Sequence, residues 1–168
     1  MLLSQGNFCS NFLSLKKANV AKESDNFLTI LPLYHSYAFT ASLLLPLLTG
    51  ATITFSSSLN ARDLTAIIRE AGATVLIGVP QIFSSIHRSI SERMKKIPLI
   101  FRPFSAIFIR EVIKRRMGSL RISASGGARL EPKTAKELFR FGIKVIEGYG
   151  LTEVSPVVTI NHLEKVKF

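Results

Sequence analysis

The sequence predicts an α/β fold, a mostly parallel sheet with helices on both faces. Short apolar runs alternate along the chain with amphipathic stretches of about ten to a dozen residues, the length that crossover helices between parallel strands require. The apolar runs are continuous and lack a polar alternation, as expected for strands buried on both faces. The sequence shows no internal repeat and no low-complexity linker, so its 168 residues are expected to form one α/β unit.

The first half of the chain supplies three expected strands and two expected helices. Asn26–Leu33 is a short apolar run interrupted by proline, and we interpret it as a buried strand. Ser36–Gly50 is typical of a helix that ends at glycine, and the β-branched Ala51–Phe55 of a strand. Asn60–Gly72 begins with a capping residue, keeps its apolar residues on one face and stops at glycine, which predicts a helix. Thr74–Val79 is another continuous apolar strand.

The second half repeats the alternation after a basic, aromatic middle. Pro80 opens a helix after the third strand. Leu120–Gly127 is a strand that runs into a glycine pair, and Pro132–Gly142 has proline at a helix start and glycine at its end. Ile143–Gly150 is predicted as a further strand, and Ser155–Asn161 as the last one.

The charge of the chain is concentrated in its middle. The formal net charge is +11, and Arg88–Arg121 holds ten basic residues against two acidic ones. Such a run is most often a solvated helix face, and attraction to anionic lipid, nucleic acid or a polyanionic substrate is the alternative. No nucleic-acid motif is recognisable there, so nucleic acid is not an expected partner. The single Cys9 excludes an internal disulfide.

Neither a signal peptide nor a membrane span is expected. In Met1–Lys17 the positive charges follow the apolar residues, the reverse of a secretory signal. Residues 26–61 contain no Asp, Glu, Lys or Arg, but Pro32, Pro46 and Gly50 interrupt the run. The predicted location is therefore cytoplasmic. The basic residues that alternate with aromatic ones in the middle segment, such as Phe101, Phe104 and Phe108, raise the alternative of peripheral contact with an anionic membrane.

Three predicted strands end in loops with unusual chemistry. His35 follows the first strand, Gly126-Gly127 follows another, and "EGYGLTE" (Glu147–Glu153) ends a third. Because the carboxyl ends of parallel strands meet at one edge of a sheet, where ligands bind in open α/β folds, these loops are expected to gather there. Tyr149 offers a stacking face, and the threonine and glutamate of the string offer a hydroxyl donor and an oxygen ligand suited to Mg²⁺.

The strings "GYGLTE", "SGGARLEP" and "LPLYHSYAFT", in this order and spacing, resemble the adenylate-forming superfamily. That superfamily includes acyl-CoA synthetases, firefly luciferase and the adenylation domains of peptide synthetases. The chain is most similar to the fatty acyl-CoA synthetases, from about residue 3 to residue 160. It contains neither a G-x-G-x-x-G fingerprint nor a Walker phosphate loop, so the nucleotide hypothesis depends on this resemblance.

The resemblance implies a set of site residues. Tyr149 would stack on adenine, Thr152 would hydrogen-bond the α-phosphate, and His35 would lie beside the substrate carboxylate. The implied catalytic residues are His35, Thr152 and Glu153; the nucleotide-binding residues are Gly126, Gly127, Ala128, Gly148, Tyr149, Gly150 and Thr152; the acyl pocket contains His35, Val79 and Pro80; and Glu153 binds Mg²⁺.

The resemblance also implies a reaction: a fatty acid or other carboxylic acid attacks ATP to give acyl-AMP, and coenzyme A then takes the acyl group. This first step needs positioning and charge stabilisation but no general base, since the nucleophile is already an anion. Relatives carry a phosphate loop just before the stretch that resembles Met1–Asn11, and a catalytic lysine in a further domain. The chain is accordingly expected to be a partial AMP-binding domain, truncated at both ends, with little catalytic activity of its own.

Simpler explanations remain for each feature. Tyr149 alone fits a turn tyrosine, His35 a core histidine, the glycine pair a tight turn, and Glu153 a surface acid. His87 and His162 have no constellation around them and are expected to be structural. The competing functions are a non-catalytic nucleotide- or acyl-binding module and, more remotely, a basic nucleic-acid-binding protein.

Overall fold

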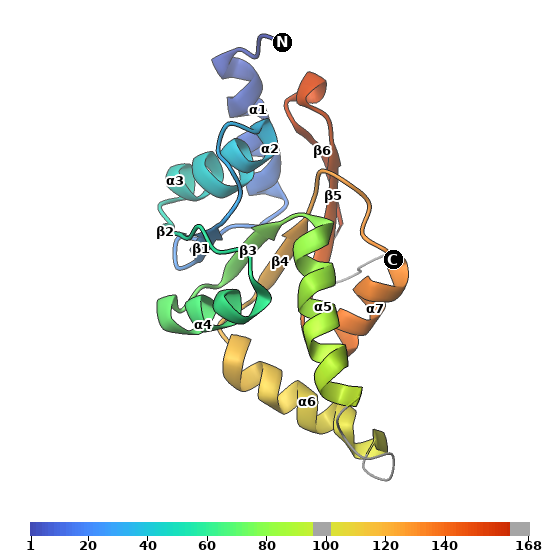
Figure 1. The fold of residues 1–168 in the computed structure, drawn as a ribbon. Helices are drawn as coiled ribbons and strands as arrows, with labels where there is room; N and C mark the ends of the chain where they lie inside the picture. Colours follow the sequence, from blue (N-terminus) through green and yellow to red (C-terminus); the bar gives the residue numbers. More distant parts are fainter. Residues whose placement is uncertain (96–101, 162–168) are drawn as a thin grey trace.

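The computed structural model describes residues 1–95 and 102–161, without the side chains of 62 and 102–107. Helices and strands alternate along this part of the chain, as the sequence predicts (Figure 1). In chain order the elements are α1 (Gln5–Lys17), β1 (Asn26–Thr29), α2 (Ser36–Ala38), a π-helical turn η1 (Phe39–Leu44), α3 (Leu45–Thr49), β2 (Thr52–Phe55), α4 (Ala61–Ala71), β3 (Val75–Gly78), α5 (Pro80–Lys95), α6 (Arg102–Met117), β4 (Ile122–Ser125), α7 (Pro132–Arg140), β5 (Val145–Gly150), a 3-10 turn η3 (Thr152–Val154) and β6 (Val157–Ile160).

The strands form one six-stranded sheet in the order β2-β1-β3-β4-β5-β6. Each neighbouring pair from β2 to β5 is parallel, and β6 alone runs antiparallel against β5 within this sheet. The predicted fold class, a mostly parallel sheet with helices on both faces, is confirmed. Because β1, β3, β4 and β5 run the same way, the loops that follow them emerge at a common edge (Figure 1).

Glycines end the predicted helices where the sequence placed them. Gly50 terminates the α2–η1–α3 helix with φ at 80°, Gly72 follows α4 with φ at 63°, and Gly142 follows α7 with φ at 91°. This left-handed conformation is easy for glycine and costly for other residues. Helix α1, helix α6 and the π-helical turn inside the Ser36–Gly50 segment were not predicted from sequence.

One face of the sheet is closed by four helices. Side chains from α4, α5, α6 and α7 form a core around Leu64, Phe83, Ile113 and Leu138, with Leu64, Phe83 and Leu138 almost fully buried. His87 on α5 lies 2.5 Å from Glu137 on α7, from Nε2 to Oε2, and therefore ties two of these helices together. The expected structural role of His87 fits this position, whereas His162 lies outside the described residues.

The opposite face is covered by α1, η1 and α3 (Figure 1). Its apolar cluster contains Phe27, Val75, Ile77, Ile122 and Ile146 from the sheet, together with Leu15, Ala41 and Leu45 from the helices. Helix α1 reaches the far edge of the sheet, where the Asn11 side-chain amide donates to the Val157 carbonyl at 2.6 Å. This face is hollow, because a cavity lies between the sheet and these helices.

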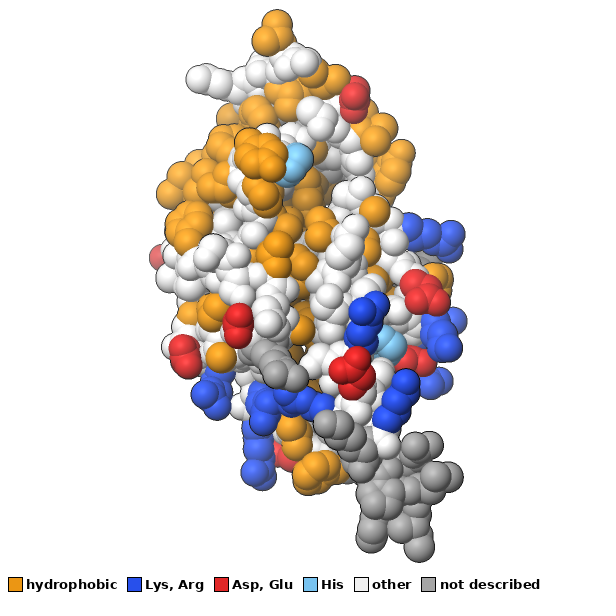
Figure 2. Space-filling model, viewed as in Figure 1, with side chains coloured by type: hydrophobic (Ala, Val, Ile, Leu, Met, Phe, Trp, Pro, Cys, Tyr) orange, Lys and Arg blue, Asp and Glu red, His pale blue; other side chains and the backbone are white. Residues whose placement is uncertain are grey.

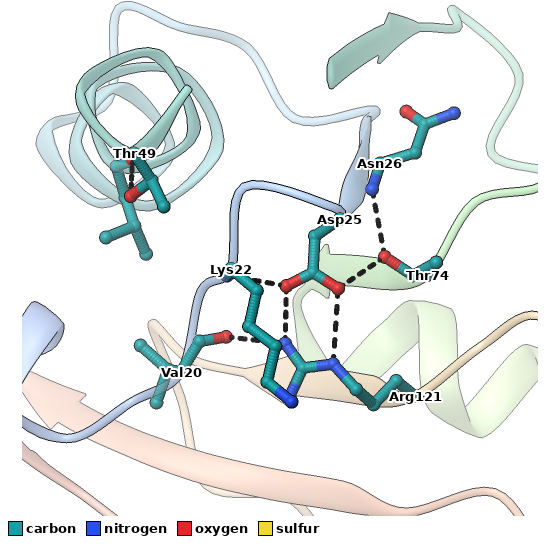
Figure 3. A network of polar contacts seen from close by, with 8 residues as sticks. Val20, Lys22, Asp25, Asn26, Thr49, Thr74 and Arg121 are labelled. Carbon is teal, nitrogen blue, oxygen red and sulfur yellow. Dashed lines mark hydrogen bonds and ion pairs between the residues drawn. The ribbon is translucent and has the colours of Figure 1, made fainter. Parts of the chain in front are cut away.

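A buried carboxylate joins the amino ends of three strands (Figure 3). Asp25, only 3% exposed, accepts hydrogen bonds from the Arg121 guanidinium at 2.5 and 3.2 Å and from the Thr74 hydroxyl at 2.8 Å. Arg121 also donates to the Val20 carbonyl at 3.3 Å, in the loop between α1 and β1. The network fixes that loop, and with it α1, against the sheet.

Candidate active site

A cavity of about 630 Å³ lies between the sheet and the α1, η1 and α3 helices. Volumes of this size are typical of small-molecule sites, which are mostly apolar with a few polar groups at one end. The strand side chains of the hollow face form its floor, among them Phe27, Ile77, Ala124 and Ile146. The loops after β1 and β5 close the carboxyl-end side, which brings the predicted motif loops to one cavity.

His35 reaches this cavity from the loop after β1. It is exposed, forms the amino-terminal cap position of α2, and its carbonyl accepts from Phe39 N at 2.9 Å. Its ring lies 4.4 Å from that of Tyr34, centroid to centroid, and Tyr34 is 83% exposed. The imidazole is therefore open to a ligand and is not a buried core histidine.

Tyr37, which sequence reasoning did not single out, explains the first glycine of the pair. A Cβ added to Gly126 would lie 2.6 Å from the Tyr37 ring, closer than any side chain allows. The Tyr37 hydroxyl donates to the Gly78 carbonyl at 3.4 Å, and burial raises the pKa of this phenol. The tyrosine thus lies across the ends of β3 and β4 and presents its ring to the cavity. Its position two residues after His35 was the available signal.

The "EGYGLTE" string folds as the end of β5 and the turn into β6. Tyr149 is 61% exposed and lines the cavity, so one face of its ring is free to stack. A Cβ added to Gly150 would lie 1.6 Å from the Pro156 carbonyl oxygen, so only glycine allows this close approach of the two hairpin strands. Gly148 also lines the cavity. The two glycines and the tyrosine therefore have distinct places in one turn.

Glu147, at the start of the string, has a structural partner. Its Oε1 accepts from Leu130 N at 2.8 Å, and Leu130 is almost fully buried. This bond holds the loop after β4, which carries Gly126 and Gly127, against β5. Two of the three motif loops are thus fixed relative to each other.

A second bond joins the His35 loop to the turn after β5. The hydroxyls of Ser36 and Thr152 lie 2.9 Å apart, across 116 residues of sequence. The His35 loop and the hairpin turn therefore meet at the rim of the cavity. Thr152 and Glu153 are both exposed in the η3 turn, so their oxygens are accessible to a ligand.

Glu153 offers one carboxylate at the rim. Among residues 1–95 and 102–161, no three or more His, Cys, Asp and Glu side chains converge as a metal cluster. A single carboxylate suits Mg²⁺, which keeps several waters and binds through one or two carboxylates plus substrate phosphates. The Glu153 carboxylate therefore fits a metal ion that binds together with a phosphate ligand.

The structure does not bring every predicted residue to the cavity. His35, Val79, Gly127, Gly148, Tyr149, Gly150, Thr152 and Glu153 line it. Gly126 is buried behind Tyr37, Ala128 is exposed beside the glycine pair, and Pro80 begins α5 outside the lining. The roles assigned to these residues stay predictions, and the geometry shows where they lie.

Charge is unevenly distributed over the molecule. In Figure 2 the upper part of the visible face is mostly hydrophobic and uncharged, whereas Lys and Arg gather over its lower and right-hand parts. Of the predicted basic-aromatic segment, Phe108 on α6 is 66% exposed, Phe101 lies outside the described residues, and the side chain of Phe104 is not described. None of the described helices is both long and apolar enough to cross a membrane. Peripheral membrane contact stays a prediction.

Comparison with known proteins indicates the family to which the chain is similar. The family model described as "AMP-binding enzyme" matches residues 1–167. The long-chain-fatty-acid–CoA ligase of Escherichia coli O6:H1 is 28% identical over 137 residues, covering 79% of this chain and 20% of that protein. The feruloyl-CoA synthase of an Amycolatopsis species is 23% identical over 159 residues, covering 95% and 28%.

The fold comparison agrees. The crystal structure of apo MatB from Rhodopseudomonas palustris matches with a TM-score of 0.77 at 25% identity, over 99% of this chain and 29% of that one. The chain therefore spans less than a third of the length of each of these three proteins.

Proposed function

The chain belongs to the AMP-binding enzyme family, and we propose that it forms the adenylate- and acid-binding part of an ATP-dependent acid–CoA ligase. One observation carries this proposal: His35, Gly127, Tyr149, Thr152 and Glu153, from loops far apart in sequence, surround the polar end of one apolar cavity. An adenylate needs a polar site and an acyl chain needs an apolar one, and the two sites must adjoin each other.

In the first proposed step, a carboxylate oxygen of the acid attacks the α-phosphorus of ATP. A new O–P bond forms, the bond to the β-phosphate oxygen breaks, and pyrophosphate leaves with its electron pair. The Thr152 hydroxyl is accessible for donation to an α-phosphate oxygen, and Tyr149 presents a ring face for adenine. Positioned donors of this kind stabilise the charge that develops in the transition state.

Mg²⁺ and coenzyme A belong to this proposal as well. Magnesium bound to the nucleotide would neutralise phosphate charge, and Glu153 is the side chain placed to hold it. In the second step the thiol sulfur of coenzyme A attacks the acyl carbonyl, AMP departs and the thiol proton is released. His35 lines the same cavity, and in this proposal it would lie beside the reacting carboxyl group.

A long-chain fatty acid is the acid we propose. The floor of the cavity is built from aliphatic strand residues and Phe27, without a charged side chain among the strand residues that line it. The relatives favour this choice only in part, because a long-chain ligase and a feruloyl-CoA synthase match at similar identity. An aromatic acid is therefore the competing substrate class.

The experiment that tests the site is calorimetric titration of the purified chain with non-hydrolysable acyl adenylates. A palmitoyl adenylate is expected to bind more tightly than AMP alone, and a feruloyl adenylate to lie between them. Absence of binding by all three would refute the adenylate site. A feruloyl compound that binds as tightly as the palmitoyl one would refute the long-chain assignment and leave the adenylate site standing.

Catalysis is a separate question, and we propose that this chain alone is a poor catalyst. Thr152 and Glu153 are the phosphate- and metal-directed groups visible around the described cavity, and losing one oxyanion donor typically costs about 10²–10³ in rate. Exchange of labelled pyrophosphate into ATP, driven by palmitate, measures the first step. Turnover close to that of a longer relative would show that this chain is sufficient. Adenylate binding without exchange is the result expected of the second candidate, a non-catalytic nucleotide- and acyl-binding module.

A further inference from the structure

A second cavity, of about 180 Å³, lies on the closed face of the sheet, away from the larger one. It is formed by the carboxyl-terminal half of α6, the turn after α6, Ser123 of β4 and the segment between α7 and β5. In Figure 1, α6 crosses the end of the sheet opposite the loops that carry the candidate active site. The two cavities share no lining residue.

Ser123 gives this cavity an unused hydrogen-bonding group. The residue is 1% exposed, and its Oγ has no hydrogen-bond partner among the described residues. Side chains alternate along a strand, and its neighbours Ile122 and Ala124 both belong to the apolar cluster of the hollow face. Ser123 therefore points towards the closed face, where it lines the second cavity. A buried hydroxyl without a partner is costly, so a ligand that accepts from it would gain.

Three cations surround the same cavity. Arg110, Lys114 and Lys144 line it, and no Asp or Glu is among its described lining residues. The ion pairs found in the described parts of the chain are His87–Glu137, Arg115–Glu111 and Arg121–Asp25, none of which includes these three cations. Arg110 and Lys114 are four residues apart on α6, where like charges repel each other. The positive charge at this cavity is thus uncompensated.

Gly142 helps to place one of these cations. Its φ is +91°, and a Cβ added there would lie 3.6 Å from Arg110 Cγ and 3.8 Å from Arg110 Nε. The arginine side chain consequently lies beside the turn after α7, and Phe141 and Ile143 form an apolar wall of the same cavity. The cavity combines an apolar wall, a buried hydroxyl and a cationic rim.

We propose that this cavity binds a phosphoryl group, either as inorganic phosphate or as the end of a small phosphorylated molecule. A phosphoryl group presents several strong acceptor oxygens and close to two negative charges at neutral pH, which match three cations and one hydroxyl donor. The apolar wall provides a contact for an organic substituent. The site is independent of the proposed ligase activity, since it uses other residues on the other face.

Titration of the purified chain with phosphate and with phenyl phosphate, at constant ionic strength, tests the proposal. Lys144→Ala is expected to weaken binding of both by about tenfold, the size of one charge-assisted hydrogen bond. Arg115→Ala is the matched control, because Arg115 lies on α6 with Arg110 and Lys114, is paired with Glu111 and does not line the cavity. Equal weakening by the two variants, or no binding by the unaltered chain, overturns the proposal.

Ser123→Ala separates binding from folding. Because Oγ has no partner to lose, this variant is expected to melt no lower than the unaltered chain in the absence of phosphate. The rise in Tm on adding phosphate should be smaller than in the unaltered chain. An undiminished rise would overturn the role of Ser123. If phenyl phosphate binds more tightly than phosphate, the ligand is an organic phosphate. If the two bind equally, the ligand is inorganic phosphate. Either result supports the phosphoryl site.

Discussion

The two faces of the same sheet are packed for different purposes. On the closed face, α4, α5, α6 and α7 surround side chains such as Phe83 and Leu138, which are completely buried. On the hollow face, α1, η1 and α3 leave about 630 Å³ between themselves and an equally apolar strand surface. Both faces have the composition of a core, but the 630 Å³ left on the hollow face is more than three times the 180 Å³ cavity of the closed face.

This difference assigns more of the fold's stability to the closed face and the proposed adenylate binding to the hollow face. An apolar surface that lacks close neighbours loses dispersion contacts, so the hollow face stabilises the fold less per residue than the closed face. The same vacancy gives an apolar ligand somewhere to bind. The motif loops converge on the hollow face, which places the candidate chemistry beside the weaker packing.

The largest effect is expected when the loop between α1 and β1, which holds α1 over the hollow face, loses its contacts with the sheet. Asp25→Ala leaves the Arg121 guanidinium without its carboxylate partner and removes the acceptor of Thr74. Removing one partner of a buried ion pair costs about 3–5 kcal/mol, and we expect a loss of this size in the free energy of unfolding in urea. Asp63→Ala is the control: this exposed carboxylate accepts from Ser58, and a change within about 0.5 kcal/mol is expected. Similar losses for both variants would contradict the role of the network.

The Asp25 carboxylate should make the stability of the fold depend on pH in the acid range. Burial alone raises the pKa of Asp25, but hydrogen bonds from Arg121, Thr74 and Lys22 N, together with the Arg121 charge, lower it below its ordinary value of 3.8. The folded state therefore binds this proton less tightly than the unfolded state. The stabilisation is fully present above pH 3.8 and is lost as the pH falls through the lower folded pKa. Asp25→Asn should flatten this part of the stability profile; an unchanged slope would contradict it.

Two leucines, one on each face of the sheet, allow the packing of the two faces to be compared directly. Leu138 on α7 is fully buried in the closed face, and Leu45 at the start of α3 is 3% exposed but lines the cavity. Leu→Ala changes in cores cost about 2–5 kcal/mol, more where neighbours cannot collapse into the space. We expect about 4 kcal/mol for Leu138→Ala and about 2 kcal/mol for Leu45→Ala, measured by urea unfolding. Equal losses would show that the hollow face is packed as tightly as the closed one.

At Tyr149 we expect a substitution to change ligand affinity strongly and the stability of the fold very little. Tyr149→Ala removes an exposed ring, so unfolding should change by less than about 0.5 kcal/mol. Stacking of a base on an aromatic ring contributes about 1–3 kcal/mol, so the affinity for an acyl adenylate should fall by about tenfold or more. Tyr149→Phe keeps the ring and is the control, with affinity close to that of the unaltered chain. An affinity unchanged in the alanine variant would remove Tyr149 from the site.

Sequence predicted the closed face better than the hollow one, for a physical reason. The closed face is built from local signals: the apolar periodicity of α4, the proline that opens α7, and the glycines after both. Helix α1 has a Ser4 cap but no apolar periodicity, since Asn11 and Leu15 are its buried residues, and Asn11 contacts Val157, 146 residues away. The antiparallel direction of β6 is likewise set by its hairpin with β5 and not by its own sequence.

The candidate site divides in the same way. The gathering of His35, Gly127 and Tyr149 follows from strand order, because loops after parallel strands share one edge. The size of the cavity and the packing of Tyr37 under Gly126 depend on how three helices settle on the sheet, which no local pattern encodes. The Ser36–Thr152 bond belongs to this second class.

That bond supports the last and smallest expected effect. Ser36 and Thr152 hydroxyls lie 2.9 Å apart at the cavity rim, and a phosphate oxygen bound by Thr152 would compete with or complete this bond. A typical hydrogen bond contributes about 0.5–1.5 kcal/mol, so Ser36→Ala should change the affinity for an acyl adenylate by about two- to tenfold. The sign is informative: weaker binding means that Ser36 orients the Thr152 hydroxyl towards the ligand, and tighter binding means that the two compete. Ser10→Ala, an exposed serine on α1, is the control and should leave the affinity unchanged. If Ser36→Ala also leaves the affinity unchanged, the two loops meet at the rim without acting on the ligand, and the hollow face needs only its apolar floor and Tyr149 to bind it.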